Sequence, residues 1–244
     1  MRPGIIQRLT RRIIDRYWRR LLDGLNRCVA RYSLLGNPEV FDASIFPWTR
    51  NLEDYWPAIR EEAEAILRRK SNAPPVGDIS PDHRRLDHRR TWRVFFLWGY
   101  GYRADQNCLL APRTAALVDE IPGLVSAMFS VHEPGTHLPR HCGPTKGHVT
   151  CHLGLMVPPD PDGCRIVVGN QVYHWQPGRF FVFDDTCQHE VWNETGEDRV
   201  ILLLHVRRPL RAPGRWMQDA VYAVVRLSPF VQDVRRKLAA AGQQ

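Results

Sequence analysis

The sequence lacks the marks of a membrane-spanning or secreted protein. No apolar run in its 244 residues approaches the ~18 residues that a transmembrane helix needs, and the N-terminus shows no apolar stretch with a small-residue cleavage site. Its six cysteines include no Cys-x-x-Cys pair, which argues against a zinc ribbon or a dithiol redox motif and favours reduced thiols. We therefore expect a cytoplasmic protein with one main globular domain.

The positive net charge of +8 is confined to the two ends of the chain. Residues 1–37 contain nine Arg against two Asp, which gives +7, and residues 207–244 contain eight Arg or Lys against two Asp, which gives +6. The centre therefore carries a charge of −5. An acidic centre argues against a nucleic-acid-binding core, so no nucleic-acid partner is expected.

Both basic ends have the pattern of amphipathic helices. From residue 5 to about residue 32, and again within 208–244, apolar residues recur at three- and four-residue spacing among arginines. Two interpretations stay open. The helices pack on the domain and show a charged face to solvent, or they lie on an anionic membrane surface at the inner face of the membrane, where each Arg or Lys contributes ~1 kcal/mol.

The central segment, residues 38–207, begins with helix and continues with strands. Residues 51–70 read as one helix with Asn51 as its N-cap, and residues 71–90 read as an exposed loop long enough to border a binding site. After residue 91 short β-branched and aromatic runs end at Gly or Pro, and Gly169-Asn170 predicts a tight hairpin. These features predict a mainly β fold, an antiparallel barrel or sandwich flanked by N- and C-terminal helices.

Two histidines close to predicted strands are candidate metal ligands. His141 lies in the run Pro-Arg-His-Cys-Gly-Pro-Thr, and His189 lies in Asp-Asp-Thr-Cys-Gln-His-Glu-Val-Trp. Iron(II) oxygenases bind their metal on one side, commonly through two His and a carboxylate, and leave the other positions open for co-substrate and dioxygen. Both histidines suit that chemistry.

An arginine near His189 is a candidate anion-binding residue. A three-residue loop at 194–196 predicts a hairpin whose register places His189 and Arg199 on the same face, two residues or ~7 Å apart along the strand. That separation suits a small dicarboxylate bound between a metal and a guanidinium. A buried Arg inside a barrel is costly without an anionic partner, which favours this function.

From Ser130 to Arg207 the chain resembles the aspartyl/asparaginyl β-hydroxylase family of 2-oxoglutarate oxygenases. The resemblance rests on His-x-Gly-Pro-Thr at His141, His-Leu-Gly-Leu at His152 and the Asp-Asp-x-x-x-His-Glu-Val-Trp run at His189, and it extends over most of residues 38–207. It implies a double-stranded β-helix, the jelly-roll or cupin-like barrel. It also implies iron(II), 2-oxoglutarate and dioxygen as the reacting groups, with iron held by His141 and His189.

The resemblance further implies which residues bind the co-substrate. Arg199 and Ser130 would bind the distal carboxylate of 2-oxoglutarate, and His152 would help. Trp92 matches a family Trp near the co-substrate, although a core aromatic on a strand fits it equally well. We group Thr150 with these residues. At its position the animal enzymes that this chain resembles have an Arg, which is expected to help hold the substrate. The difference leaves the substrate of this chain open.

Three functions follow from these observations. The first is hydroxylation of the β-carbon of an aspartyl or asparaginyl unit in a peptide or amino acid. The second is hydroxylation of a lipid or acyl chain at the membrane, as in lipid A 2-hydroxylases, whose motif looks more like His-x-Asp. Gly143 instead resembles the β-hydroxylases, in which water is expected to replace the carboxylate ligand. The third is a non-catalytic barrel that serves as a binding module.

Overall fold

The computed structural model describes residues 22–79, 83–228, 231–233 and 235–236, and most of the helix expected from residue 5 lies outside these ranges. Residues 22–32 are helical. None of the helices within the described ranges is both long and apolar enough to cross a membrane. All six cysteines are free thiols, as the sequence predicts.

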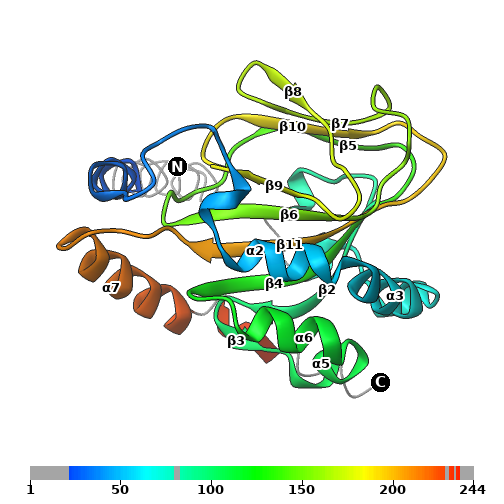
Figure 1. The fold of residues 1–244 in the computed structure, drawn as a ribbon, viewed down its shortest axis with the longest axis horizontal. Helices are drawn as coiled ribbons and strands as arrows, with labels where there is room; N and C mark the ends of the chain where they lie inside the picture. The colour runs from blue at the N-terminus through cyan, green and yellow to red at the C-terminus, as the bar shows by residue number, and fades with distance from the viewer. Residues whose placement is uncertain (1–21, 80–82, 229–230, 234, 237–244) are drawn as a thin grey trace, which may run out of the picture.

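Two antiparallel sheets form a double-stranded β-helix (Figure 1). The larger sheet has the order β1-β9-β6-β11-β4-β2-β3 and contains β1 (Val40–Phe41), β2 (Trp92–Gly99), β3 (Tyr102–Arg103), β4 (Leu124–His132), β6 (His148–Met156), β9 (Phe180–Phe183) and β11 (Arg199–Arg207). The smaller sheet has the order β5-β10-β7-β8 and contains β5 (Thr136–His141), β7 (Cys164–Val168), β8 (Gln171–Tyr173) and β10 (His189–Asn193). The mainly β fold predicted from the sequence is confirmed.

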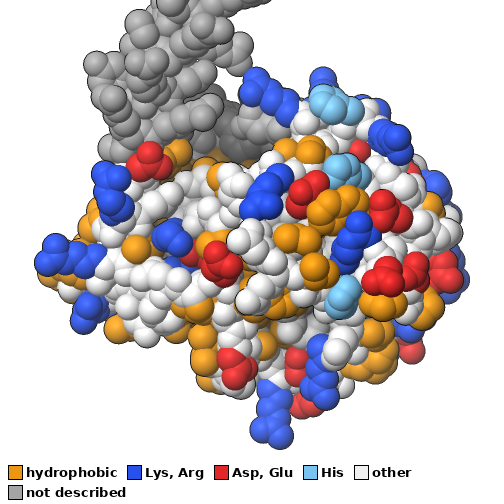
Figure 2. Space-filling model, turned by 90° about the horizontal axis from the view of Figure 1, so that it is seen from above, with side chains coloured by type: hydrophobic (Ala, Val, Ile, Leu, Met, Phe, Trp, Pro, Cys, Tyr) orange, Lys and Arg blue, Asp and Glu red, His pale blue; other side chains and the backbone are white. Residues whose placement is uncertain are grey.

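The larger sheet is buried on both faces, and the two faces differ in what covers them. Helices cover its outer face, where residues such as Ile59, Val118 and Phe129 form one apolar cluster. Its inner face packs on the smaller sheet through a second cluster that includes Val94, Ile166 and Ile201. The outer face of the smaller sheet, seen from above in Figure 2, carries acidic, basic and apolar side chains interspersed, as expected of a solvated surface.

The helices are shorter and more numerous than the sequence indicates. They are η1 (Ala43–Ile45), α2 (Trp48–Asp54), α3 (Trp56–Leu67), η2 (Lys70–Asn72), α4 (Val76–Ile79), η3 (His83–Arg85), α5 (Asp105–Leu110), α6 (Pro112–Asp119) and α7 (Gly214–Leu227). The single helix expected over residues 51–70 is wrong, because Pro57 starts a new helix in its first turn and Asn51 lies inside α2. The helices α5 and α6 were not expected.

The hairpin expected around residues 194–196 is also wrong, whereas the one at Gly169-Asn170 is confirmed between β7 and β8. The strand β10 pairs with β5 and β7, and β11 pairs with β4 and β6, so the chain crosses from one sheet to the other between them. The Asn193 side chain holds this crossing by donating to the carbonyl oxygens of His132 at 2.7 Å and Glu197 at 2.9 Å. His189 and Arg199 therefore belong to opposite sheets.

Candidate active site

The two predicted metal ligands lie side by side in the smaller sheet. His141 on β5 and His189 on β10 are direct cross-strand partners, and their ring centroids are 4.1 Å apart. Each ring is held through Nδ1, which lies 2.8 Å from the Pro139 carbonyl oxygen in His141 and 3.0 Å from the Cys187 carbonyl oxygen in His189. With Nδ1 protonated in this way, Nε2 keeps its lone pair, which is how metal-binding histidines are commonly held.

The electrostatic environment keeps His141 neutral. Burial, together with the neighbouring His189, lowers the pKa of His141 to about 4. A metal ion binds the neutral imidazole, so His141 is available as a ligand at neutral pH without losing a proton.

A carboxylate that the sequence did not single out lies against Gly143. An ideal Cβ on Gly143 would lie 2.4 Å from Asp185 Oδ2, and the Gly143 N–H donates to the Asp185 carbonyl oxygen at 2.7 Å. Asp185 Oδ1 is buried and has no hydrogen-bond partner among the described residues. Burial opposes ionisation, but the His148 imidazole and its neighbours lower the pKa of the Asp185 carboxyl to about 2. Asp185 thus brings a negative charge to the position where Gly143 lacks one.

Asp184, the residue before Asp185, has a structural role. Asp184 is fully buried and forms ion pairs with Arg208 at 2.8 Å and with Lys146. Its other oxygen accepts from the Thr186 hydroxyl at 2.5 Å and backbone N–H at 3.1 Å. All of its acceptor capacity is used in holding the loop between β9 and β10, so Asp184 fixes the loop that presents Asp185.

The predicted anion-binding arginine is buried between the sheets. Arg199 on β11 is 1% exposed, its guanidinium carbon lies 4.4 Å from the Trp175 ring centroid, and its Nη2 donates to His132 Nδ1. Its Nε and Nη1 have no partner among the described residues, and no carboxylate pairs with it there. Burial lowers its pKa to about 10, so the guanidinium is still charged at neutral pH. Two unpaired charged donors in a buried position are what a small carboxylate would satisfy.

Three of the other predicted co-substrate residues lie near Arg199, because Trp92 contacts His132 and His152 contacts Trp175. Ser130 on β4 and Trp92 on β2 are both buried, and the Trp92 indole donates to the Ser130 hydroxyl at 2.9 Å, which leaves the hydroxyl proton free to donate elsewhere. The Trp175 indole donates to His152 Nδ1 at 3.2 Å, so Nε2 of His152 carries the proton. Burial, with a contribution from Arg199, holds the pKa of His152 well below its usual value.

Aromatic contacts connect the surroundings of Arg199 to the histidine pair. The His152 and Phe183 rings are 5.3 Å apart, and the Phe183 and His189 rings are 5.2 Å apart. His83 of η3 lies edge-on against Trp92 at 5.2 Å, so the segment expected to border a site does border this one.

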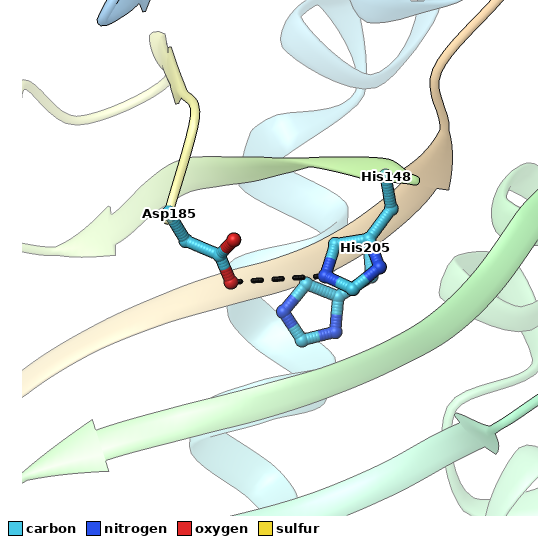
Figure 3. A group of neighbouring side chains, drawn as sticks. All are labelled: His148, Asp185 and His205. Atoms are coloured by element: carbon cyan, nitrogen blue, oxygen red, sulfur yellow. Dashed lines mark ion pairs between the residues drawn. The ribbon is translucent and has the colours of Figure 1, made fainter. Parts of the chain in front are cut away.

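Thr150 and two further histidines lie where the start of β6 meets the end of β11. The histidines are His148 on β6 and His205 on β11. Thr150 is buried, and its hydroxyl has no partner among the described residues. It pairs in register with His205 on β11, and the His205 ring packs against the His148 ring in a tilted arrangement with centroids 4.6 Å apart. Asp185 approaches this pair, with its Oδ2 3.7 Å from His148 Nε2 (Figure 3).

Sequence reasoning missed His132, Trp175, Asp185 and His205 as site residues. Neither His132 nor Trp175 lies in a motif. His132 on β4 is the register partner of Arg199, and Trp175 reaches the Arg199 guanidinium from the segment after β8, so only the fold brings them together. The position of Asp185 was a usable signal, because it is an acid only four residues before the candidate ligand His189.

Comparison with known proteins was made on the whole sequence. The family model described as Aspartyl/Asparaginyl beta-hydroxylase matches residues 53–209. An ornithine lipid ester-linked acyl 2-hydroxylase from Rhizobium tropici is 44% identical over 203 residues, which cover 83% of this chain and 72% of the relative. The human aspartyl/asparaginyl beta-hydroxylase is 32% identical over 169 residues, or 67% of this chain, but this chain spans only 21% of the human protein. Among solved structures, a prolyl-4-hydroxylase from Pseudomonas putida aligns over 63% of this chain and 88% of its own with a TM-score of 0.42 and 19% identity.

Proposed function

Because the chain belongs to the aspartyl/asparaginyl β-hydroxylase family, we propose that it is an iron(II)- and 2-oxoglutarate-dependent dioxygenase that hydroxylates an unactivated carbon. The observation that carries this proposal is Arg199, a buried guanidinium with two unpaired nitrogens on the inner face of the barrel. A binding module without catalysis has no need for such a group in the same barrel as a cross-strand pair of histidines.

His141 and His189 hold the iron in this proposal. Their Nδ1 contacts to backbone carbonyl oxygens orient both rings, and Asp185 supplies the negative charge that Gly143 lacks. Bound iron, with 2-oxoglutarate and dioxygen, supplies the oxidising power for the reaction. The protein contributes position, charge and exclusion of water.

Arg199 binds the distal carboxylate of 2-oxoglutarate, and Ser130 and His152 assist. Arg199 offers Nε and Nη1, Ser130 offers the hydroxyl proton that its bond with Trp92 leaves free, and His152 offers Nε2–H. Trp92 acts by orienting Ser130. A dicarboxylate held at this end would direct its keto acid toward the histidine pair.

We propose an acyl chain of a membrane lipid as the substrate, in preference to the aspartyl or asparaginyl β-carbon expected first. Two observations support this choice. The rhizobial relative, named as a lipid acyl hydroxylase, matches 83% of this chain at 44% identity. Thr150 also places a neutral hydroxyl where an Arg would attract an acidic substrate, and His205 beside it is held neutral because burial and His148 lower its pKa to about 3. The β-carbon of an aspartyl unit stays the second candidate.

The helix α7 supports a position on the membrane surface. Its outward face carries Trp216, Val224 and Leu227, which are 64, 70 and 77% exposed, with alanines between them at helical spacing. Its opposite face is fixed to the barrel, because Gln218 donates to the Gly147 carbonyl oxygen at 2.6 Å and the Tyr222 hydroxyl bonds His148. An apolar stripe of this kind inserts into the headgroup region of a bilayer.

The charge around α7 suits an anionic bilayer. Arg211, Arg215 and Arg226 are exposed on or next to the helix, and Asp219 is neutralised by Arg207 at 2.6 Å. Each cation near such a surface contributes ~1 kcal/mol of attraction. We therefore propose that the protein binds peripherally at the inner face of the membrane and reaches its acyl substrate there.

The test is anaerobic reconstitution with iron(II) and 2-oxoglutarate, followed by admission of oxygen with candidate substrates. We expect succinate to form, and vesicles of anionic and amine-bearing lipids to gain the mass of one oxygen atom on an acyl chain. Aspartyl and asparaginyl peptides serve as the second arm, and oxygen gain on peptide but not on lipid would replace the proposed substrate. No succinate with any substrate, from protein that has bound iron, would contradict the proposed reaction.

A further inference from the structure

A group of three metal-ligating side chains lies beside the proposed iron site, and two of them, His148 and His205, have no part in that site. The rings of His148 on β6 and His205 on β11 pack at a tilt with a centroid distance of 4.6 Å, and Asp185 reaches them from the loop before β10 (Figure 3). One ligand atom from each residue can be chosen so that all three lie within 4.8 Å of one another. Two imidazoles and a carboxylate facing one point are a common ligand set for first-row transition metals.

Two members of this group, His148 and Asp185, are held in place by contacts outside it. His148 Nδ1 is bonded to the Tyr222 hydroxyl at 3.0 Å, which leaves Nε2 directed toward Asp185. Asp185 is held by the backbone bond from Gly143, and its Oδ1 is buried without a partner among the described residues. Metal-binding histidines are commonly held by a hydrogen bond on the nitrogen that does not bind the metal, and a buried carboxylate oxygen without a partner can be satisfied by a cation.

We propose that His148, Asp185 and His205 form a second binding site for a divalent transition-metal ion, with Asp185 lying between the two sites. Imidazole and carboxylate together favour Zn²⁺, Fe²⁺ or Co²⁺ over Mg²⁺ or Ca²⁺, which prefer oxygen ligands alone. Metal–ligand distances near 2.1 Å in tetrahedral geometry require ligand atoms ~3.4 Å apart, so binding draws the three side chains together by ~1 Å. The inference goes beyond the proposed function, and either can fail without the other.

The decisive measurement is the metal content of full-length protein in which the first site has been removed. We choose Zn²⁺, which undergoes no redox chemistry, and measure its stoichiometry by equilibrium dialysis and elemental analysis. The His141→Asn/His189→Asn variant should retain one tightly bound Zn²⁺, and adding His205→Asn should abolish it. The exposed His137→Asn serves as the matched control for adventitious surface binding and should change nothing.

A milder variant keeps the test valid if loss of a buried histidine impairs folding. Tyr222→Phe removes only the hydroxyl that holds His148 Nδ1, and it should weaken Zn²⁺ binding by ~10- to 100-fold in the His141→Asn/His189→Asn background. Thermal unfolding of each variant reports whether it is folded. If folded His141→Asn/His189→Asn protein binds no Zn²⁺, or if its Zn²⁺ affinity is unchanged by both His205→Asn and Tyr222→Phe, the second site does not exist. Succinate formation by the wild type would be unaffected by that result.

Discussion

Asp185 occupies the space that a side chain on Gly143 would need, because an ideal Cβ there would lie 2.4 Å from Oδ2 and 2.5 Å from Cγ of Asp185. The Asp185 carboxyl therefore leaves no room for a side chain at position 143, which explains the glycine there. The carboxylate that many oxygenases carry two residues after their first histidine reaches the same region here from a different loop.

Replacing Gly143 tests this relationship. Gly143→Asp forces two carboxyl groups into one space, so we expect the free energy of unfolding to fall by ~1–3 kcal/mol and iron affinity to fall as well. Thermal unfolding and metal titration measure the two effects. Gly196→Ala is the matched control, because a Cβ at that position meets nothing within 4 Å. The exchange Gly143→Asp/Asp185→Gly should recover much of both losses, and a stable, fully active Gly143→Asp would contradict the arrangement.

Arg199 and Arg208, both fully buried, should respond oppositely to removal of their charge. Arg199 has no anionic partner in the described chain, so Arg199→Met should leave the apo protein as stable as the wild type or more stable. Arg208→Met removes one ion-pair partner of buried Asp184, so the free energy of unfolding should fall by ~3–5 kcal/mol.

Ligand binding separates the same two variants. At a 2-oxoglutarate concentration of 100 times Kd, the wild type should gain ~2.7 kcal/mol of stability, which calorimetry detects as a rise in Tm. Arg199→Met should lose this gain. An Arg199→Met protein that is strongly destabilised without ligand, yet still stabilised by 2-oxoglutarate, would refute the assigned role.

Acidification should destabilise the metal-free protein in a defined window. The pKa of His141 falls from an ordinary value of 6.5 to about 4 in the folded state, and that of His205 falls to about 3. As the pH falls, the unfolded chain takes up these protons before the folded protein does. The contribution of the two neutral imidazoles to the free energy of unfolding is therefore fully present above pH 6.5 and is lost as the pH falls toward 4 and 3. Each imidazole contributes a slope of up to ~1.4 kcal/mol per pH unit.

Denaturant unfolding of chelator-treated protein between pH 7 and pH 4 measures this slope. His141→Asn should reduce it by about one proton's contribution. An unchanged slope in His141→Asn would mean that this imidazole is not held neutral by the fold.

The apolar stripe on α7 should govern membrane binding. Leu227→Glu and Trp216→Glu place a charge on the face that enters the bilayer, so each should lower binding to anionic vesicles by tenfold or more in a sedimentation assay. Leu109→Glu, on a side chain of α5 that is 71% exposed, is the matched control and should bind as the wild type does. Equal losses in all three variants would point to a general effect of charge and not to a docking helix.

The strands were predictable where a local pattern fixes them, and the crossings between sheets were not. The dipeptide Gly169-Asn170 determines its own hairpin, because the turn and both strands lie within a few residues. At residues 194–196 the same rule fails, because β11 gains more from pairing with β4 and β6 along its whole apolar length than from folding back on β10. Competition between distant strands leaves no mark in the local sequence.

The sequence predicted each of the two histidines to lie close to a strand, and the structure places both on strands, but the pairing that brings them together is long-range. His141 and His189 are cross-strand partners on β5 and β10, which motif spacing alone cannot reveal. The same holds for Asp185, whose meeting with Gly143 depends on a loop that is fixed by the Asp184–Arg208 ion pair. The motifs therefore indicate which residue types form the site, and only the three-dimensional structure shows which of them are in contact.

The central claim is that His141 and His189 hold iron while Arg199 holds 2-oxoglutarate. The most direct measurement is succinate formation after anaerobic loading with iron(II), compared among the wild type, His189→Asn, Arg199→Met and the exposed control His137→Asn. The account predicts iron-dependent succinate in the wild type and the control, none in His189→Asn, and a greatly raised KM for 2-oxoglutarate in Arg199→Met. Succinate formed without iron, or formed equally by all four proteins, would contradict it.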